Sequence, residues 1–296
     1  MRKADALLSP FAALPQAWVP DWPAPARVKA VMTTRHGGTS VPPFDSLNLG
    51  DHVRDEPSRV QANRQHLAVA LGAQPVFLQQ VHGARCVTLA PDTPHGTQAD
   101  ACVTRQTQMV CTVMVADCLP VLLCDSAGQT VGAAHAGWRG LAGAGGVAAG
   151  GVLAQFLKHF CAISLNDIDK FATYFELNQS TAAPTASTMA WLGPCIGPEA
   201  FEVGPEVRTA FLDVAHSFAA TAACFEAVWG KAGFHRCDLA ALARLQLAAL
   251  GVGRVYGNDS SPAWCTVGQP SVWFSHRRDA ARLGSTGRMA ACIWLD

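Results

Sequence analysis

Two histidines and one cysteine follow predicted β-strands and could together bind a metal ion. His82, Cys118 and His135 each stand at or just beyond the carboxyl end of a candidate strand. Those strands are predicted at Phe77–Val81, Val110–Val115 and Thr130–Ala134. If the strands neighbour one another in a sheet, where adjacent strands lie about 4.8 Å apart, their ends can bring two imidazoles and a thiolate to one point. Two nitrogens and one sulfur, with a fourth position left for water, are typical of a catalytic zinc site.

The same three residues also allow other roles, because they are too far apart in the chain to form a spacing motif. In a second interpretation, His135 or His82 deprotonates Cys118 for nucleophilic attack on a carbonyl group. In a third, the histidines are buried core residues with satisfied hydrogen bonds. The residue pattern alone leaves all three interpretations open.

Charged residues are rare around these candidates. Between residues 101 and 157 the chain has four charged side chains. One of them, Asp117, directly precedes Cys118, and another, Arg139, follows His135 by four positions. A charge in so apolar a stretch costs free energy unless something pairs with it, so both are candidate site residues. Asp117 could carry a proton or orient a histidine ligand.

Two glycine-rich basic turns could bind an anion such as phosphate. Gly137-Trp-Arg-Gly140 leads from a strand end into a predicted helix, where exposed N–H groups and the guanidinium of Arg139 suit phosphate. Arg35, in Thr33-Thr-Arg-His-Gly-Gly38, directly follows another strand. Neither turn is a Walker or dinucleotide motif, and an ordinary surface turn is the alternative for both. Arg277 follows an aromatic segment and on its own indicates a solvated strand end.

Composition excludes several classes of protein. Of 296 residues, 50% are hydrophobic and 15% are charged, which is typical of a compact globular chain. The 22 basic and 22 acidic residues cancel, so we expect no attraction to nucleic acid or to an anionic membrane. We find no secretion signal and no apolar run suited to a membrane span. The eleven cysteines include no CxxC pair and predict reduced thiols in the cytoplasm, most of them packed in the core, as we expect for Cys102, Cys111, Cys124 and Cys292.

Short apolar segments bounded by Gly, Pro and Asp indicate an α+β fold in one domain. Residues 1–27 are rich in proline and alanine and predict an extended surface arm, followed by a single domain over 28–296 with a surface insertion at about 161–190. Strands are predicted at Val28–Thr33, Val76–Gln80, Cys86–Leu89, Val110–Val115, Val121–Cys124, Thr130–Ala134, Val272–Phe274 and Arg288–Trp294. Helices are predicted at Pro57–Leu71, Leu141–Phe160, Pro205–Ala215 and Leu239–Leu250, the second weakened by its glycines.

A set of segments, in order over roughly residues 28–295, resembles the YfiH-type laccase-domain family. Members of that family are also called purine nucleoside phosphorylases, polyphenol oxidases or peptidoglycan editing factors. The matching segments are Thr33-Thr-Arg-His-Gly-Gly-Thr-Ser40, Ser46-Leu-Asn-Leu-Gly50, Leu78-Gln-Gln-Val-His-Gly83, Ala116-Asp-Cys-Leu-Pro120, Ala134-His-Ala-Gly-Trp-Arg-Gly140, Leu192-Gly-Pro-Cys-Ile-Gly-Pro198, Phe201-Glu-Val-Gly204, Phe274-Ser-His-Arg-Arg-Asp279 and Thr286-Gly-Arg-Met289.

The resemblance implies a mixed α/β/β/α sandwich, similar to cytotoxic necrotising factor deamidases. It implies zinc, with copper as the alternative, on His82, Cys118 and His135. The implied activity is phosphorolysis of adenosine, inosine and methylthioadenosine, with deamination of adenosine. We assign Arg35 and Asn48 to phosphate and substrate because their motifs fall beside the same pocket in the family.

We add Asp117 to the catalytic residues and Arg139 and Arg277 to the phosphate-binding and substrate-binding residues. The expected partners are purine nucleosides and phosphate, and the expected state is a monomer or small homo-oligomer.

Other functions remain as alternatives. An amidase that removes a wrong amino acid from a UDP-linked cell-wall precursor could use the same metal or Cys118. A snug aromatic pocket would favour the nucleoside, and a wide basic cleft would favour the precursor. A copper oxidase of phenols ranks low, because the ten histidines contain no His-x-His pair. A binding protein with a purely structural metal also ranks low, because closed structural sites use four ligands.

Overall fold

The computed structural model describes residues 13–14, 16–144, 150–164 and 185–296. Most of the predicted insertion at 161–190 therefore lies outside the described residues, as does much of the predicted arm. At the ends of the insertion, residues 161–164 complete a helix and residues 188–190 begin a strand. In the described part of the arm, the backbone of Trp18 forms an antiparallel β-bridge with Met32. The ring centroid of Trp18 lies 4.9 Å from that of Trp273.

The first sheet has four strands in the order β1-β13-β5-β2. Strand β13 is antiparallel to both of its neighbours, and β2 is parallel to β5. The strands are β1 (Val28–Met32), β2 (Gln74–Phe77), β5 (Met109–Val115) and β13 (Met289–Leu295). Along β13, side chains alternate between a core shared with the second sheet and a core shared with helix α1 (Pro57–Leu71).

The second sheet has six strands in the order β12-β8-β6-β7-β4-β3. These strands are β3 (Cys86–Thr88), β4 (Ala101–Thr104), β6 (Leu119–Asp125), β7 (Val131–Ala136), β8 (Thr188–Leu192) and β12 (Arg254–Gly257). The central strands β6, β7 and β8 are buried along their whole length, which explains why their sequences are continuous apolar runs rather than alternating ones.

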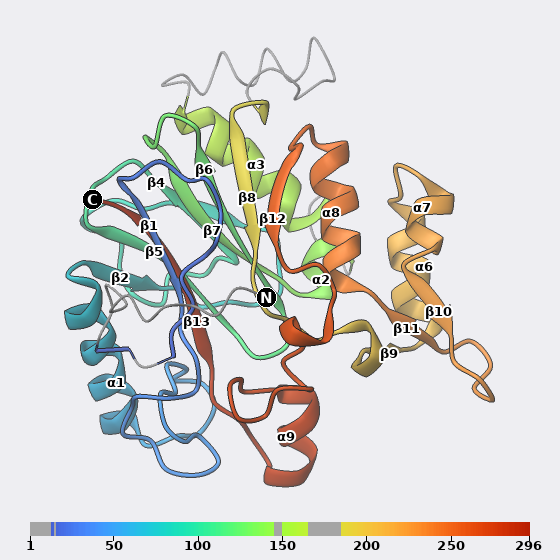
Figure 1. The fold of residues 1–296 in the computed structure, drawn as a ribbon, viewed down its shortest axis with the longest axis horizontal. Helices are drawn as coiled ribbons and strands as arrows, with labels where there is room; N and C mark the ends of the chain where they lie inside the picture. The colour runs from blue at the N-terminus through green and yellow to red at the C-terminus, as the bar shows by residue number, and fades with distance from the viewer. Residues whose placement is uncertain (1–12, 15, 145–149, 165–184) are drawn as a thin grey trace.

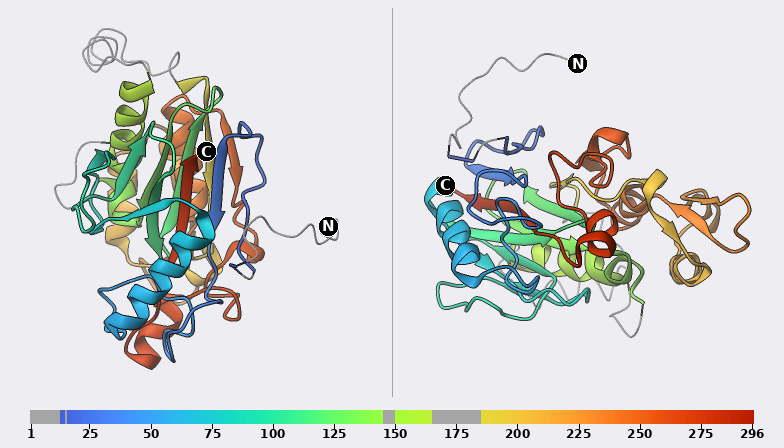
Figure 2. Two further views of the ribbon diagram at one scale, coloured as in Figure 1. Left: turned by 90° about the vertical axis from the view of Figure 1, so that its left-hand side faces the viewer. Right: turned by 90° about the horizontal axis from the view of Figure 1, so that it is seen from below.

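The two sheets pack face to face between helices, which gives the expected α/β/β/α order of layers. One face of the six-stranded sheet contributes to the core shared with the first sheet. Its other face is covered by α2 (Trp138–Ala142), α3 (Gly151–Ser164) and α8 (Leu239–Ala249). In Figure 1, α1 lies at the far side of the sheets from α8, and Figure 2 shows the same separation from below. The prediction of a mixed α+β single-domain fold is confirmed.

A smaller unit projects from one side of this sandwich (Figure 1, orange). Its three-stranded sheet has the order β10-β11-β9. It comprises β9 (Glu202–Val203), β10 (Phe225–Ala227), β11 (His235–Cys237), α6 (Pro205–Asp213) and α7 (Phe218–Ala222). The remaining elements are α9 (His276–Leu283) and two 3₁₀ turns, Pro198–Ala200 and Pro262–Trp264.

Two predicted elements are wrong in the structure. The predicted strand Val272–Phe274 is a turn at Val272 followed by irregular backbone, in which Trp273 and Phe274 are buried in the core between the sheets. The predicted helix Leu141–Phe160 is interrupted, because α2 ends at Gly143, which has φ 64°. By contrast, α1 begins at Pro57 and ends at Gly72 (φ 61°) as predicted. No helix among the described residues is long and apolar enough to cross a membrane.

Candidate metal centre and adjoining cavity

The structure brings His82, Cys118 and His135 together. The potential ligand atoms of the three side chains lie within 4.8 Å of one another, and Sγ of Cys118 is 3.7 Å from Nε2 of His82. The two imidazole rings meet edge to face, with centroids 4.8 Å apart. Two imidazole nitrogens and a sulfur at this spacing could hold a zinc-like ion after small shifts, because zinc binds nitrogen at about 2.0 Å and sulfur at about 2.3 Å.

The three side chains come from both sheets rather than from neighbouring strands of one sheet. His82 lies in the loop beyond β2, and Cys118 lies in the turn that joins β5 to β6. His135 lies on β7 of the six-stranded sheet. The expectation of a single sheet is therefore wrong for His135, and the cluster forms where the ends of the two sheets meet.

Local backbone geometry explains how the side chains converge. His82 and Asp117 have φ values of 59° and 89°, which non-glycine residues adopt only when other contacts hold them there. Gly137 leaves the necessary space, because a Cβ atom there would lie 3.0 Å from both Sγ of Cys118 and Cδ2 of His82. The missing side chain at Gly137 thus leaves room for Cys118 and His82.

Asp100 holds the His82 turn and the His135 ring with one carboxylate. Its oxygens accept N–H groups of Val81, His82 and Gly83 at 3.2, 2.9 and 2.7 Å. One of them also lies 2.9 Å from Nδ1 of His135. That bond leaves Nε2 of His135 available to a metal, as in other carboxylate–histidine–metal arrangements. The sequence analysis missed Asp100, whose only signal was its place in the chain directly before a buried strand.

The electrostatics of the cluster favour a thiolate. Burial alone would raise the pKa of the Cys118 thiol, but the charge of His135 and hydrogen bonds from both histidines outweigh burial and lower it to about 6. Burial would lower the pKa of His135, but the charge of Cys118 and the bond to Asp100 raise it to about 9. A thiolate is the form that binds metals and attacks carbonyls, so the geometry is compatible with both chemistries.

Asp117 forms no hydrogen bond or ion pair with His82 or His135. Its oxygens accept hydrogen bonds from Oγ1 of Thr266 (2.5 Å), Oγ of Ser275 (3.0 Å) and the backbone N–H of Arg277 (2.6 Å). Thr266 and Ser275 precede α9, and Arg277 lies in the first turn of that helix. The carboxylate of Asp117 thus holds this segment beside Cys118, and Asp100, rather than Asp117, orients a histidine.

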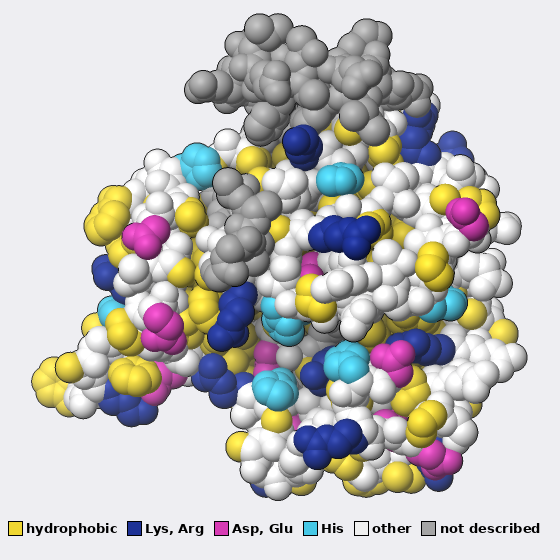
Figure 3. Space-filling view, turned by 180° about the vertical axis from the view of Figure 1, so that it is seen from behind, with side chains coloured by type: hydrophobic (Ala, Val, Ile, Leu, Met, Phe, Trp, Pro, Cys, Tyr) yellow, Lys and Arg dark blue, Asp and Glu magenta, His cyan; other side chains and the backbone are white. Residues whose placement is uncertain are grey.

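A cavity of about 340 Å³ adjoins the three candidate ligands. Part of its wall is apolar, and the rest is polar or cationic. The apolar part includes Met114, Trp138, Ile196, Phe201 and Leu239, and the polar part includes Gln80, His52, His276, Arg277 and Arg288. On the face shown in Figure 3, several histidine side chains gather near Lys or Arg side chains. The cavity is of the size that small-molecule sites have.

Of the four predicted phosphate or substrate residues, only Arg277 lines this cavity. Arg139 is exposed and stacks on Trp138 with 4.3 Å between the guanidinium and the ring centroid. Arg35 lines a separate hollow, where it pairs with Asp45 at 3.1 Å. Asn48 is fully buried and bonds to neighbouring backbone groups. The sequence analysis missed Arg288, although this residue lies in one of the segments that carry the family resemblance.

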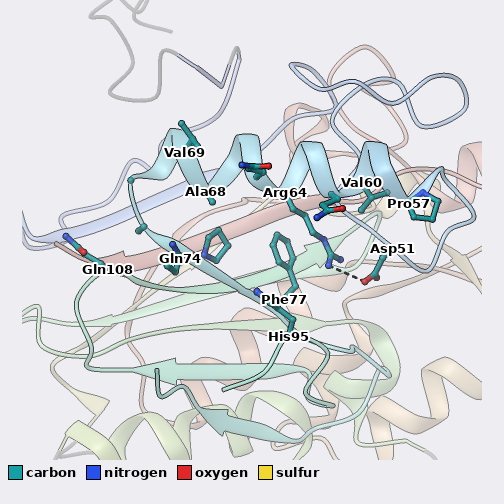
Figure 4. A pocket seen from close by; sticks show the side chains of 15 residues that line it. Asp51, Pro57, Val60, Arg64, Ala68, Val69, Gln74, Phe77, His95 and Gln108 are labelled. Atoms are coloured by element: carbon teal, nitrogen blue, oxygen red, sulfur yellow. Dashed lines mark hydrogen bonds and ion pairs between the residues drawn. The ribbon is translucent and has the colours of Figure 1, made fainter. Parts of the chain in front are cut away.

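A larger hollow of about 800 Å³ lies between α1 and β2 (Figure 4). Its arginine, Arg64, pairs with Asp51 at 3.2 Å and stacks on Phe77 at 4.1 Å. The hollow lacks the candidate ligands, and among the described residues the His82–Cys118–His135 cluster is the one group placed to hold a metal ion. We therefore place the candidate chemistry in the smaller cavity.

Fold and site together define a mixed α+β domain with a candidate three-residue metal centre at the junction of two sheets. Residues 29–296 match a family model described as multi-copper polyphenol oxidoreductase laccase. The chain belongs to this family, the YfiH-type laccase-domain proteins, as the sequence resemblance predicted.

Relatives support this assignment over nearly the whole chain. A purine nucleoside phosphorylase of Pseudomonas aeruginosa is 42% identical over 94% of this chain and 98% of its own. The purine nucleoside phosphorylase YfiH of Escherichia coli K12 has the same identity and coverage. The crystal structure of a Neisseria meningitidis protein of family DUF152 covers 95% of this chain and 99% of its own, with 41% identity and a TM-score of 0.78. The structure of YlmD from Geobacillus stearothermophilus is 29% identical and has a TM-score of 0.71, covering 91% of this chain and 92% of its own.

Proposed function

We propose that this protein is a zinc-dependent purine nucleoside phosphorylase that acts on adenosine, inosine and methylthioadenosine and also deaminates adenosine. One observation carries the proposal: the candidate metal ligands open into a cavity with an apolar wall on one side and cationic side chains on another. An apolar wall suits a purine base, and cationic groups suit phosphate. The relatives are named purine nucleoside phosphorylases, which supports the phosphorolysis in this proposal.

The ligand set supports zinc. Nε2 of His82, Sγ of Cys118 and Nε2 of His135 would bind the ion and leave a coordination position open. Zinc bound there would supply a Lewis acid and would make a bound water acidic enough to ionise near neutral pH. Copper also binds imidazole and sulfur and is the alternative ion for this site.

The protein's own residues would orient the substrates. Trp138 and Phe201 would pack against the purine and exclude water from it, which strengthens electrostatic interactions in the cavity. Arg277 would bind phosphate through its guanidinium. Asp117 would position Arg277 and the segment before α9 rather than touch the substrate, because its carboxylate already accepts three hydrogen bonds from them.

Phosphorolysis and deamination place different demands on this one site. Phosphorolysis requires phosphate held beside the anomeric carbon and stabilisation of the departing purine. Deamination requires an activated water near the purine ring. We assign both to the same cavity, since the described residues hold no second group of candidate metal ligands.

The cavity favours a nucleoside over the alternatives. Its volume of about 340 Å³ and its Trp138 and Phe201 suit a purine nucleoside better than a large UDP-linked cell-wall precursor. A phenol-oxidising copper cluster needs many more ligands than the three that converge among the described residues.

All eleven cysteines are free thiols, which supports the proposal of a cytoplasmic protein. That the protein is a monomer or small homo-oligomer remains a prediction.

The decisive experiment incubates the zinc-loaded protein and a Cys118→Ala variant with adenosine, with and without phosphate. We expect adenine and ribose 1-phosphate from the intact protein only when phosphate is present, inosine in both reactions, and loss of all products in the variant. Absence of turnover of any purine nucleoside by the intact protein would refute the proposal, and the cell-wall precursor would then be the substrate to test.

A further inference from the structure

Arg288 is a partly buried cation that lines the candidate metal cavity. It directly precedes β13, and it forms no ion pair with any carboxylate of the described residues. Arg35, Arg64 and Arg278, by contrast, each pair with an aspartate. Burial lowers the pKa of Arg288, against the opposing charges of Cys118 and Asp117. A partly buried guanidinium with no directly paired carboxylate is further stabilised by an anion bound in the same cavity.

The structure holds Arg288 firmly in place. Its backbone N–H donates to Oδ1 of Asn48 at 2.9 Å, and the same oxygen accepts the N–H of Gly50. The alkyl part of Arg288 crosses Gly50 so closely that a Cβ atom on Gly50 would lie 2.7 Å from its Cγ. Asn48 and Gly50 both belong to the Ser46-Leu-Asn-Leu-Gly50 segment, which the proposed reaction otherwise leaves without a role.

The guanidinium has hydrogen-bond donors to spare. Nη1 donates to the carbonyls of Thr286 and Gly287 at 3.0 and 3.2 Å. Nε and Nη2 have no hydrogen-bond partner within the part of the chain that the structure describes. One Nε–H and one Nη2–H form the planar fork that binds two oxygens of a phosphate group.

The balance of charge in the cavity also favours a dianion. Arg277 and Arg288 contribute two positive charges, and a divalent ion on the three ligands would outweigh the single charge of the Cys118 thiolate. The negative charge of Asp117 is already shared among three hydrogen bonds. Inorganic phosphate is the anion that matches this charge and the planar donors of Arg288.

We propose that Arg288 binds the phosphate substrate beside the candidate metal ligands, and that Asn48 and Gly50 are positioning residues that hold its guanidinium there. The inference rests on the proposed function in one respect, namely that phosphate is a substrate. It reassigns Asn48 from substrate contact to support of Arg288, and it places the phosphate site away from Arg35 and Arg139.

The test measures binding of inorganic phosphate by calorimetry to the metal-free and the zinc-loaded protein, separately from turnover. The variants are Arg288→Gln, Arg288→Lys and Gly50→Ala, and the matched control is Arg236→Gln, an exposed arginine that pairs with Glu199 on the projecting unit. Unfolding temperature and zinc content check that each variant is folded and loaded.

We expect Arg288→Gln to weaken phosphate binding by about tenfold or more in both forms, since a charge-assisted pair is lost. The phosphate affinity of Arg288→Lys should lie between those of Arg288→Gln and the intact protein, because lysine keeps the positive charge but lacks the planar pair of N–H donors. Gly50→Ala should weaken phosphate binding at an unchanged zinc content, and Arg236→Gln should bind as the intact protein does. In turnover, the KM for phosphate should rise in Arg288→Gln while the KM for the nucleoside stays within about twofold.

The outcomes separate the inference from the proposed function. Equal phosphate affinity in Arg288→Gln and the intact protein would overturn the inference, as would the absence of phosphate binding by the zinc-loaded intact protein. Phosphorolysis with an unchanged KM for phosphate in Arg288→Gln would refute the inference while the proposed function stands. Phosphate binding that depends on Arg288, without cleavage of any nucleoside, would support the inference and refute the proposed function.

Discussion

At the residue scale, Asp100 connects two candidate metal ligands that lie far apart in the chain. Its carboxylate accepts three N–H groups of the turn that carries His82 and contacts the ring of His135. These bonds fix the backbone of one ligand and the ring orientation of the other. A metal site built this way needs little rearrangement when the ion binds, which favours affinity.

Replacement of Asp100 by asparagine should weaken zinc binding by about 10–100-fold, because the ring of His135 loses its charged partner. Burial would raise the pKa of the Asp100 carboxyl, but the bond and charge of His135 lower it below the usual value of 3.8. The stabilisation from Asp100 is therefore present above pH 3.8 and is lost as the pH falls through the lower pKa of the folded protein.

Competition with a chelator measures the zinc affinity of Asp100→Asn and of the intact protein. Urea denaturation of both proteins at several pH values measures how the stabilisation from Asp100 depends on pH. The exposed Asp92→Asn serves as the control. Zinc affinity in Asp100→Asn equal to that of the control would contradict this role.

Cys118 should be the reactive thiol of the metal-free protein. Its pKa of about 6 means that it is mostly thiolate above that pH and mostly thiol below it. The rate of alkylation by iodoacetamide should therefore fall by half near pH 6, and mass spectrometry can assign the label. Burial raises the pKa of Cys111, Cys195 and Cys292, so these residues should stay unlabelled. A midpoint near the ordinary value of 9 would contradict the ion pair between Cys118 and His135.

At the scale of elements, the candidate site depends on how strands end. Gly137 joins β7 to α2 and lies against the ligands because it has no side chain. Asp117, in the turn before β6, holds the start of α9 and thereby places Arg277 at the cavity. The ends of β2, β5 and β7 and the start of α9 therefore build one site from four separate parts of the chain.

Substitution of Gly137 by alanine should displace Cys118 or His82, since the added Cβ atom would lie 3.0 Å from each. We expect a loss of zinc affinity of about tenfold or more with little change in unfolding temperature of the metal-free protein. Gly253→Ala is the matched control, because a Cβ atom there meets nothing within 4 Å. If both variants bind zinc equally well, the close approach at Gly137 has no part in forming the site.

At the scale of the whole molecule, stability depends on the layer between the two sheets. This layer contains fully buried apolar side chains from β5, β6, β7, β8 and β13. Packing in this layer also fixes the position of the second sheet, which carries His135, relative to the end of β5, which precedes Cys118. Loss of packing in this layer should therefore lower stability and, when severe, disturb the site as well.

Ile293→Ala tests this layer. Ile293 is fully buried between the sheets, so its truncation should lower the free energy of unfolding by about 2–5 kcal/mol. Val69→Ala on α1 is the control, because Val69 is 75% exposed, and its change should stay within about 0.5 kcal/mol. Urea denaturation measures both. If Ile293→Ala lowers the free energy of unfolding as little as Val69→Ala does, the layer between the sheets does not have the proposed importance for stability.

The elements that could be predicted from sequence carry their own local signals. Helix α1 has Pro57 in its first turn and Gly72 after its end, and both act without help from the rest of the fold. β13 was predicted within a residue at each end, because seven consecutive buried positions leave only apolar side chains. The short strands β9 to β12 have no such signal, since their pairing partners lie elsewhere in the chain.

The sequence by itself determined which reactive groups follow the predicted strands, namely two imidazoles and a thiol, together with the apolar strands and the absence of net charge. It could not determine which charged residues surround those ligands. Asp100 bonds to the turn that carries His82, and Asn48 accepts the N–H of Arg288, through contacts between segments distant in sequence, whereas Arg35 pairs with Asp45 outside the cavity. Only the tertiary structure decided this, because a hydrogen bond depends on distances of about 3 Å that the folded chain alone fixes.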